Sequence, residues 1–66
     1  DSLIKTQNLS GMNLSFANLS NQNLDSTNFD NSMLIETNFE NTKCENCSFD
    51  DVNLKSANLT GSNIKQ

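Results

Sequence analysis

An apolar residue recurs at every fifth position of this chain, and this period restricts the available folds more than any other feature of the sequence. From residue 4 onward, thirteen such positions follow one another without a gap. A repeat of this regularity is considered before any single helix or strand, because it sets the architecture of the whole chain. With Cys44 counted as a small hydrophobe, the thirteen central residues are Ile4, Leu9, Leu14, Leu19, Leu24, Phe29, Leu34, Phe39, Cys44, Phe49, Leu54, Leu59 and Ile64.

A period of five suits neither of the regular elements. Side chains five residues apart in an extended strand point to opposite faces, since they alternate along it. In an α-helix, five residues advance by about 500°, so the apolar side chains would spread around the helix. Every fifth side chain stays on one side only if the chain bends once per repeat. Equal bends in one direction produce a coil, and stacked coils share one apolar core.

The other positions of the repeat agree with a bent, repeating backbone. The position two residues before each centre holds mostly small side chains, as a second inward position would, and the position just before the centre is Asn in nine of thirteen repeats. Asn bonds to nearby backbone and tolerates left-handed conformations, so we expect it to form the bend. The two positions after the centre carry nearly all of the charge and should face water.

The segments ANLSN (residues 17–21) and ANLTG (residues 57–61) resemble the consensus A-(D/N)-L-x-x of the pentapeptide-repeat family. The resemblance extends over almost the whole chain. It implies an all-β fold, a right-handed quadrilateral parallel β-helix with four repeats per coil and about three coils. We expect residues 1–66 to form a single domain of this kind, either a fragment or an uncapped module, since the ends of a solenoid are normally covered.

Four repeats per coil would arrange the central residues in four columns that are apolar throughout. Each column contributes one side of a shared core, and the columns that contain phenylalanine should hold much of the stability. The columns are Ile4/Leu24/Cys44/Ile64, Leu9/Phe29/Phe49, Leu14/Leu34/Leu54 and Leu19/Phe39/Leu59.

Three apolar residues interrupt the polar outward positions around one column. Phe16, Met33 and Ile35 stand where neighbouring repeats have polar residues. Four repeats per coil would place them on one face of adjacent coils, where an exposed apolar patch suggests a contact surface. Three scattered apolar residues on a small protein need no such explanation. Both interpretations remain open at the level of the sequence.

Seven of the eight acidic residues lie between residues 25 and 51. The predicted coil stacks Asp25 on Glu45 and Asp30 on Asp50, with Asp51 beside the second pair. Such an acidic face could bind Ca²⁺ through oxygen ligands or imitate phosphate charge, although no loop of EF-hand form is present. The simpler interpretation is a solvated face that keeps the protein soluble.

The two cysteines form a Cys-x-x-Cys motif at Cys44 and Cys47. A tetrahedral zinc site needs four ligands, and with two cysteines and no histidine it cannot be completed. Both residues fall on inward positions, so we expect two buried free thiols that serve in packing. Free thiols in turn favour a reducing compartment such as the cytoplasm.

Composition removes several functional classes. The net charge of −4, with four lysines and no arginine, leaves little to neutralise phosphates, so direct binding of nucleic acid or an anionic membrane is not expected. No apolar run approaches the roughly 20 residues that cross a bilayer. Without histidine, a catalytic triad or a phosphate loop, the sequence predicts no enzyme, no cofactor, no metal and no small-molecule substrate.

The remaining classes concern interactions between proteins. The first is a structural or interaction module that contacts a protein partner or associates with itself. The family resemblance implies an alternative, an acidic DNA mimic that binds DNA gyrase, as in quinolone-resistance pentapeptide proteins. An ice-binding solenoid would need an outward column of threonines, and the sequence has none. We therefore adopt the interaction module as the first hypothesis.

Overall fold

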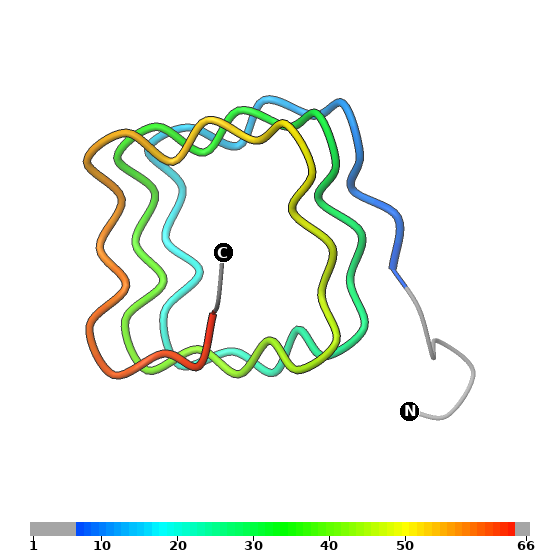
Figure 1. The fold of residues 1–66 in the computed structure, drawn as a ribbon. Helices are drawn as coiled ribbons and strands as arrows, with labels where there is room; N and C mark the ends of the chain where they lie inside the picture. Colours follow the sequence, from blue (N-terminus) through cyan, green and yellow to red (C-terminus); the bar gives the residue numbers. More distant parts are fainter. Residues whose placement is uncertain (1–6, 65–66) are drawn as a thin grey trace.

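The computed structural model describes residues 7–64, which wind into successive coils that lie one on another (Figure 1). Asn8 pairs with Asn28, and Asn28 pairs in turn with Ser48, so each coil contains twenty residues. Seen along the stack, the coils overlie one another with a roughly square outline (Figure 1). Ile4, the first predicted central residue, lies outside the described residues.

The described residues contain neither a helix nor an extended strand. Single-residue parallel bridges join the coils instead, each between residues twenty apart, such as Asn18 with Asn38 and Asn23 with Lys43. Strands in globular proteins are commonly about five to six residues long. Here the backbone turns every five residues, so pairing stops before a strand of that length can form.

Backbone hydrogen bonds between adjacent coils follow a recurring pattern, which is complete in the repeats centred on Phe29, Leu34 and Phe39. The N–H of the central residue donates to the following coil, as Phe29 N does to Ser48 O at 2.8 Å. The N–H of the residue before it donates to the preceding coil, as Asn28 N does to Gln7 O at 2.8 Å. A third bond comes from the second residue after the centre, as from Asn31 N to Asp50 O at 2.8 Å. The coils thereby satisfy one another's polar backbone groups.

The bend of each repeat lies after the centre, not at the Asn that precedes it. Left-handed φ angles between 57° and 72° occur at the second residue after each centre, and the carbonyl of the centre accepts a bond from the N–H three residues on, as Leu34 O does from Thr37 N at 3.2 Å. A positive φ at only the third turn residue is the type II pattern. The prediction that the Asn before the centre forms the bend is therefore wrong. The left-handed residues are Gly11, Phe16, Asn21, Ser26, Asn31, Glu36, Asn41, Asn46, Asp51, Ser56 and Gly61.

The Asn before the centre has a different role, in line with the expectation that it bonds to nearby backbone. Its side-chain oxygen accepts a hydrogen bond from the N–H two residues on, as Asn28 Oδ1 does from Asp30 N at 2.8 Å and Asn38 Oδ1 from Glu40 N at 2.9 Å. This local bond leads the chain from the bridge into the turn. The Asn that accepts the local hydrogen bond and the left-handed residue that forms the bend are thus three positions apart.

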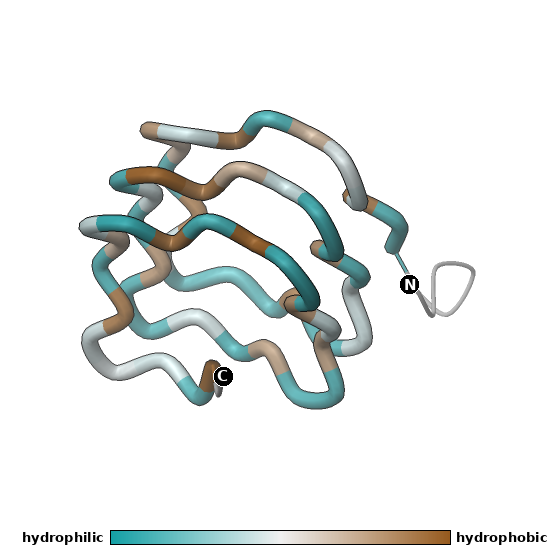
Figure 2. The backbone as a smooth tube through the Cα atoms, turned by 45° about the horizontal axis from the view of Figure 1, so that its top comes forward, coloured by the Kyte–Doolittle hydropathy of each residue, from teal (hydrophilic) through white to brown (hydrophobic). Residues whose placement is uncertain are grey.

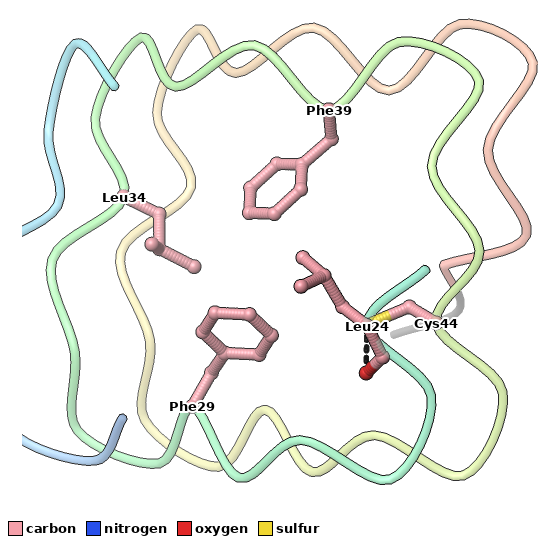
Figure 3. Packing of buried hydrophobic residues seen from close by; sticks show 5 residues of the cluster. All are labelled: Leu24, Phe29, Leu34, Phe39 and Cys44. Carbon is pink, nitrogen blue, oxygen red and sulfur yellow. Dashed lines mark hydrogen bonds between the residues drawn. The ribbon is translucent and has the colours of Figure 1, made fainter. Parts of the chain in front are cut away.

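The buried core is centred on the middle coil (Figure 3). The Phe29 ring meets Phe39 edge to face with centroids 5.9 Å apart and stacks on Phe49 in the next coil at 5.0 Å. Along every coil, hydrophobic and hydrophilic segments alternate (Figure 2). The buried apolar residues are Leu24, Phe29, Leu34, Phe39 and Cys44, and the half-buried central residues packed against them are Leu9, Leu14, Leu19, Phe49, Leu54, Leu59 and Ile64.

Small hydroxyl side chains fill the space between the central residues. Thr37 Oγ1 donates a hydrogen bond to Leu14 O at 2.8 Å, and Thr42 Oγ1 donates to Leu19 O at 2.7 Å. Both bonds reach a carbonyl of the preceding coil and so connect coils through side chains as well as backbone. Thr27 is equally buried, but its hydroxyl has no partner among the described residues.

Replacement of Phe29 by alanine should destabilise the protein strongly. The side chain is fully buried and contacts two other rings, so we expect a loss of about 3–5 kcal/mol in the free energy of unfolding. Urea denaturation measures this loss. Phe49→Ala is the matched control and should cost less, because Phe49 is only half-buried. A melting temperature of Phe29→Ala within a few degrees of the wild type would contradict the core assignment.

The threonines offer a second test, with valine as a replacement of nearly the same shape. Thr37→Val removes a buried hydrogen bond and should lower the free energy of unfolding by about 1 kcal/mol. Thr27→Val removes a buried hydroxyl that has no partner among residues 7–64, so on that basis it should be neutral or stabilising. Thermal denaturation of both variants gives the comparison. Equal losses would show that the bond from Thr37 to the preceding coil contributes nothing.

Candidate functional site

Phe16, Met33 and Ile35, which we name the apolar patch, are brought onto adjacent coils. Phe16 N donates a hydrogen bond to Ile35 O at 2.9 Å, so the two residues are direct neighbours across the coils. Met33 forms the bridges to Asn13 and Asn53 in the same column of repeats. Phe16 is 72% exposed and Met33 43% exposed, while Ile35 is half-buried. The three side chains therefore present apolar area at one place on the stack.

Met12 adds exposed apolar area beside the patch and was not identified from the sequence. Its carbonyl accepts a hydrogen bond from Met33 N at 2.9 Å, and its side chain is 45% exposed. Met12 stands two residues before the centre of its repeat, a position that usually holds a small inward side chain, so the period of five predicts that it is buried. The first described coil has only one neighbouring coil among residues 7–64, so this position is not covered on both sides.

Phe16 combines exposure with an unfavourable backbone conformation. Its φ of 68° lies in the left-handed region, where a bulky residue is an outlier and Asn is several-fold enriched. The left-handed conformation costs an L-residue roughly 1–2 kcal/mol. The equivalent positions of the other described repeats hold Asn, Ser, Gly, Glu or Asp. Phe16 thus has an unfavourable backbone conformation, and the free energy it costs is not offset by burial of the aromatic side chain.

The acidic residues stack across adjacent coils, and two of them bond to the backbone of the next coil. Asp25 Oδ1 accepts a hydrogen bond from Glu45 N at 2.8 Å, and Asp30 Oδ1 accepts one from Asp50 N at 2.9 Å. The Asp30 carboxylate also accepts a short bond from the Ser48 hydroxyl. These two carboxylates therefore help to join the coils.

The other acids are more open to solvent, and the described residues do not group them into a metal site. Glu45, Asp50 and Asp51 are exposed, and Asp51 is itself a left-handed turn residue. Within residues 7–64, no three side chains of His, Cys, Asp or Glu come together in a way that could hold a metal ion. The arrangement fits charged rows along the stack better than it fits the 6–8 oxygen ligands of Ca²⁺.

Cys44 and Cys47 are joined by a disulfide bond, so the prediction of two free thiols is wrong. The residues are the first and last of one turn, which brings their Cα atoms to 5.4 Å, within the usual range for a disulfide. The turn could not be placed from the sequence alone, because the bend was expected at the Asn. The argument for a reducing compartment depended on free thiols and loses its basis.

The disulfide borders a hollow beside the last described repeat. The hollow has a volume of about 430 Å³. Cys44 is only 4% exposed, whereas Cys47 is half-buried. The lining residues are Cys44, Glu45, Asn46, Cys47, Phe49 and Asn63.

Comparison with known families finds a match to pentapeptide repeats, in 8 copies, over residues 8–41 and 34–66. The chain belongs to the pentapeptide-repeat family. Such repeats generally form a β-helix, and in this pentapeptide-repeat protein the parallel bridges and interlocking coil bonds are the features that agree with that architecture. No curated protein and no solved structure is significantly similar to the chain. In the described part of this protein, no helix has the length and apolar character needed to cross a membrane.

Replacement of Phe16 by asparagine should stabilise the isolated pentapeptide-repeat protein. Asn tolerates the left-handed conformation, so we expect a gain of about 1 kcal/mol in the free energy of unfolding. For a domain of this size, that gain raises the melting temperature by about 4–8 °C. Asn21→Phe is the matched reverse change, at an exposed turn residue with φ of 59°, and should lower it. A fall in melting temperature for Phe16→Asn would show that Phe16 contributes to the stability of the fold itself.

Proposed function

We propose that this pentapeptide-repeat protein is a non-enzymatic structural module that binds a protein through the apolar patch, with a second copy of itself as the simplest partner. The fold that would carry this function is a right-handed quadrilateral β-helix of about three coils. The twenty-residue spacing of the bridges and the roughly square outline support the quadrilateral form. The right hand rests on the resemblance to the family.

The observation that carries the proposal is the state of Phe16. Its side chain is 72% exposed, and its φ is 68°, so the residue adds strain without contributing much buried area to the isolated chain. Strained conformations tend to occur at functional sites. Aromatic residues also dominate the binding energy of many protein interfaces. A partner that covers Phe16 would supply the burial that the isolated chain does not.

The backbone under the patch supports this function by being held in place. Phe16 N and Leu14 N donate to Ile35 O and Met33 O of the next coil at 2.9 and 2.8 Å, and Ile35 N donates to Ser15 Oγ at 3.2 Å. A preorganised surface loses less conformational freedom on binding than a flexible one. The repeat therefore provides a firm platform, on which a few apolar side chains supply the contact.

Light scattering after size exclusion, over a range of concentrations, tests the proposal with a second copy as the partner. We expect the wild type to exceed the monomer mass at high concentration and Ile35→Asp to remain monomeric, because a buried charge opposes association. Thr60→Asp is the control, since Thr60 is exposed at the same position of a repeat in another column. A wild type that stays monomeric at every concentration would contradict self-association through the patch. Equal weakening by both variants would instead indicate an effect of charge alone.

An acidic DNA mimic that binds DNA gyrase is the second proposal. The stacked acids, with Glu45, Asp50 and Asp51 exposed, favour it. The bonds of Asp25 and Asp30 to the next coil weigh against it, because these carboxylates are partly used within the fold. Inhibition of gyrase supercoiling by the wild type, weakened in Asp50→Asn/Asp51→Asn, would support this alternative. Absence of inhibition at high protein concentration would remove it.

A further inference from the structure

One side of the coil carries Met33 and Ile35 and presents the same positions of each repeat to the outside. These positions are the turn residue that precedes the side, the bridge residue in its middle and the first residue after the centre. In the middle coil they hold Asn31, Met33 and Ile35, and the two residues that alternate with them are buried. We name the surface formed by residues 11–15, 31–35 and 51–55 the patch side.

Exposure on the patch side is a property of the position in the repeat. Asn31 and Met33 are exposed although a coil packs on either side of them, as the bridges of Met33 to Asn13 and Asn53 show. Glu36 holds the position of Phe16 one coil further on and is exposed as well. A side chain at one of these positions therefore points outward wherever its coil lies in the stack.

Opposite charges stand at the two edges of the patch side within one coil. Asp51 is the turn residue at one edge, Lys55 follows the centre at the other edge, and both are exposed. The backbone of Lys55 is held in place, because its N–H donates to Asn53 Oδ1 at 3.1 Å and its carbonyl accepts from Glu36 N at 2.9 Å. The two charges are thus presented at fixed places, with Asn53 between them.

The size of the side chains differs between the same two edges in the first described coil. Phe16, with its exposed ring, stands at the edge that Lys55 occupies two coils later. At the opposite edge the chain has Ser10 and Gly11, which are small and exposed. The largest side chain at one edge therefore has the smallest residues across from it.

From this distribution of charge and size we propose that two copies of the chain pair through the patch side about a two-fold axis parallel to the stack. The inference rests on the proposed function and adds the orientation of the second copy. Such an interface is isologous, so every contact in it occurs twice, except at the axis itself. Each coil lies against the same coil of the other copy, so the pairing is the same for any number of coils.

Rotation about this axis exchanges the two edges of the patch side and brings complementary residues together. Lys55 comes opposite Asp51 of the second copy, and Phe16 comes opposite its Ser10 and Gly11. Met33 of each copy meets Met33 of the other at the axis, which places exposed apolar area in the centre of the interface. Opposite charges then lie at the rim, where they set the orientation of the partners.

A two-fold axis across the stack is the competing arrangement, and it lacks this charge complementarity. It reverses the order of the coils and leaves the edges unexchanged. When Met33 again meets Met33, Lys55 comes opposite Ser15 and Asp51 comes opposite Gly11, so neither charge finds a partner of opposite sign. The charges of this side therefore favour the axis parallel to the stack.

One pair of like charges approaches in the proposed arrangement, at the edges of the middle coil. Glu36 lies at one edge, and Asp30 of the second copy lies at the edge opposite it. The Asp30 carboxylate is held within its own chain by bonds from Asp50 N and the Ser48 hydroxyl. These bonds already use its charge and limit the repulsion that Glu36 would meet.

Exchange of the two rim charges tests the orientation. Dimer dissociation constants come from light scattering after size exclusion over a range of concentrations, for the wild type, Lys55→Asp, Asp51→Lys and the double variant. Each single change places like charges opposite one another twice, so we expect dissociation constants at least about tenfold higher. The double variant restores opposite charges and should return to within about threefold of the wild type.

The variants are compatible with the repeat, and a control separates the contact from net charge. Asp already occupies the position of Lys55 in three other repeats, and Glu36 shows that the left-handed position of Asp51 accepts a long side chain. Melting temperatures check that each variant is folded. Lys43→Asp changes the net charge as Lys55→Asp does, but at an exposed bridge residue on another side of the coil, and should leave the dissociation constant nearly unchanged.

The possible failures distinguish this inference from the proposed function. A dimer that Ile35→Asp disrupts but Lys55→Asp leaves unchanged would keep the apolar patch as the interface and overturn the orientation. A double variant as weak as the single ones, or equal weakening by Lys43→Asp, would also overturn the orientation. A wild type that is monomeric at every concentration would overturn both proposals.

Discussion

The left-handed turn residue that recurs every five positions is the constraint on which the rest of this structure depends. It occurs at the second residue after each described centre up to Gly61, with φ between 57° and 72°. Equal turns at equal intervals return the chain to the same place after twenty residues, as the bridges from Asn8 to Asn28 and from Asn28 to Ser48 show. Only then do the central residues align into columns, and only then can the backbone groups of one coil bond to those of the next. The apolar core is a consequence of this regular geometry as much as its cause.

Burial is uneven along the stack, and this unevenness places the features of functional interest. The middle coil contains the fully buried Phe29, Leu34 and Phe39, while most central residues of the coils on either side are half-buried. Regions with fewer buried apolar contacts open at lower free energy than the core. Phe16 lies on the coil before the middle one, and Cys47 lies beside the hollow that Asn63 also lines. Both features therefore adjoin the stable middle coil.

Polar side chains in this protein join coils as well as interact with water. Thr37 and Thr42 bond inward to carbonyls of the preceding coil, and Asp25 and Asp30 bond to backbone N–H groups of the following one. Low apolar content, which in a sequence of this composition suggests disorder, is compatible with an ordered stack for this reason. The apolar patch and the disulfide are the two places where side chains do more than the repeat requires.

The sequence by itself determined a backbone that bends once per repeat and the inward central positions, because a period of five fixes which side chains share a side. The neighbourhood of Phe16 and Ile35 needed in addition the four repeats per coil that the resemblance to the family implied. The sequence also indicated the local bond of each Asn, since that bond involves residues only two apart. Only the tertiary structure decided where the bend lies, that the coils pair through single bridges instead of strands, and that Met12 is exposed. The disulfide between Cys44 and Cys47 belongs to the same group, because it requires the turn to bring two Cα atoms to 5.4 Å. The physical reason is that a period specifies direction around the coil, whereas φ angles, burial at the ends of the stack and contacts between sulfur atoms depend on the geometry of the folded backbone.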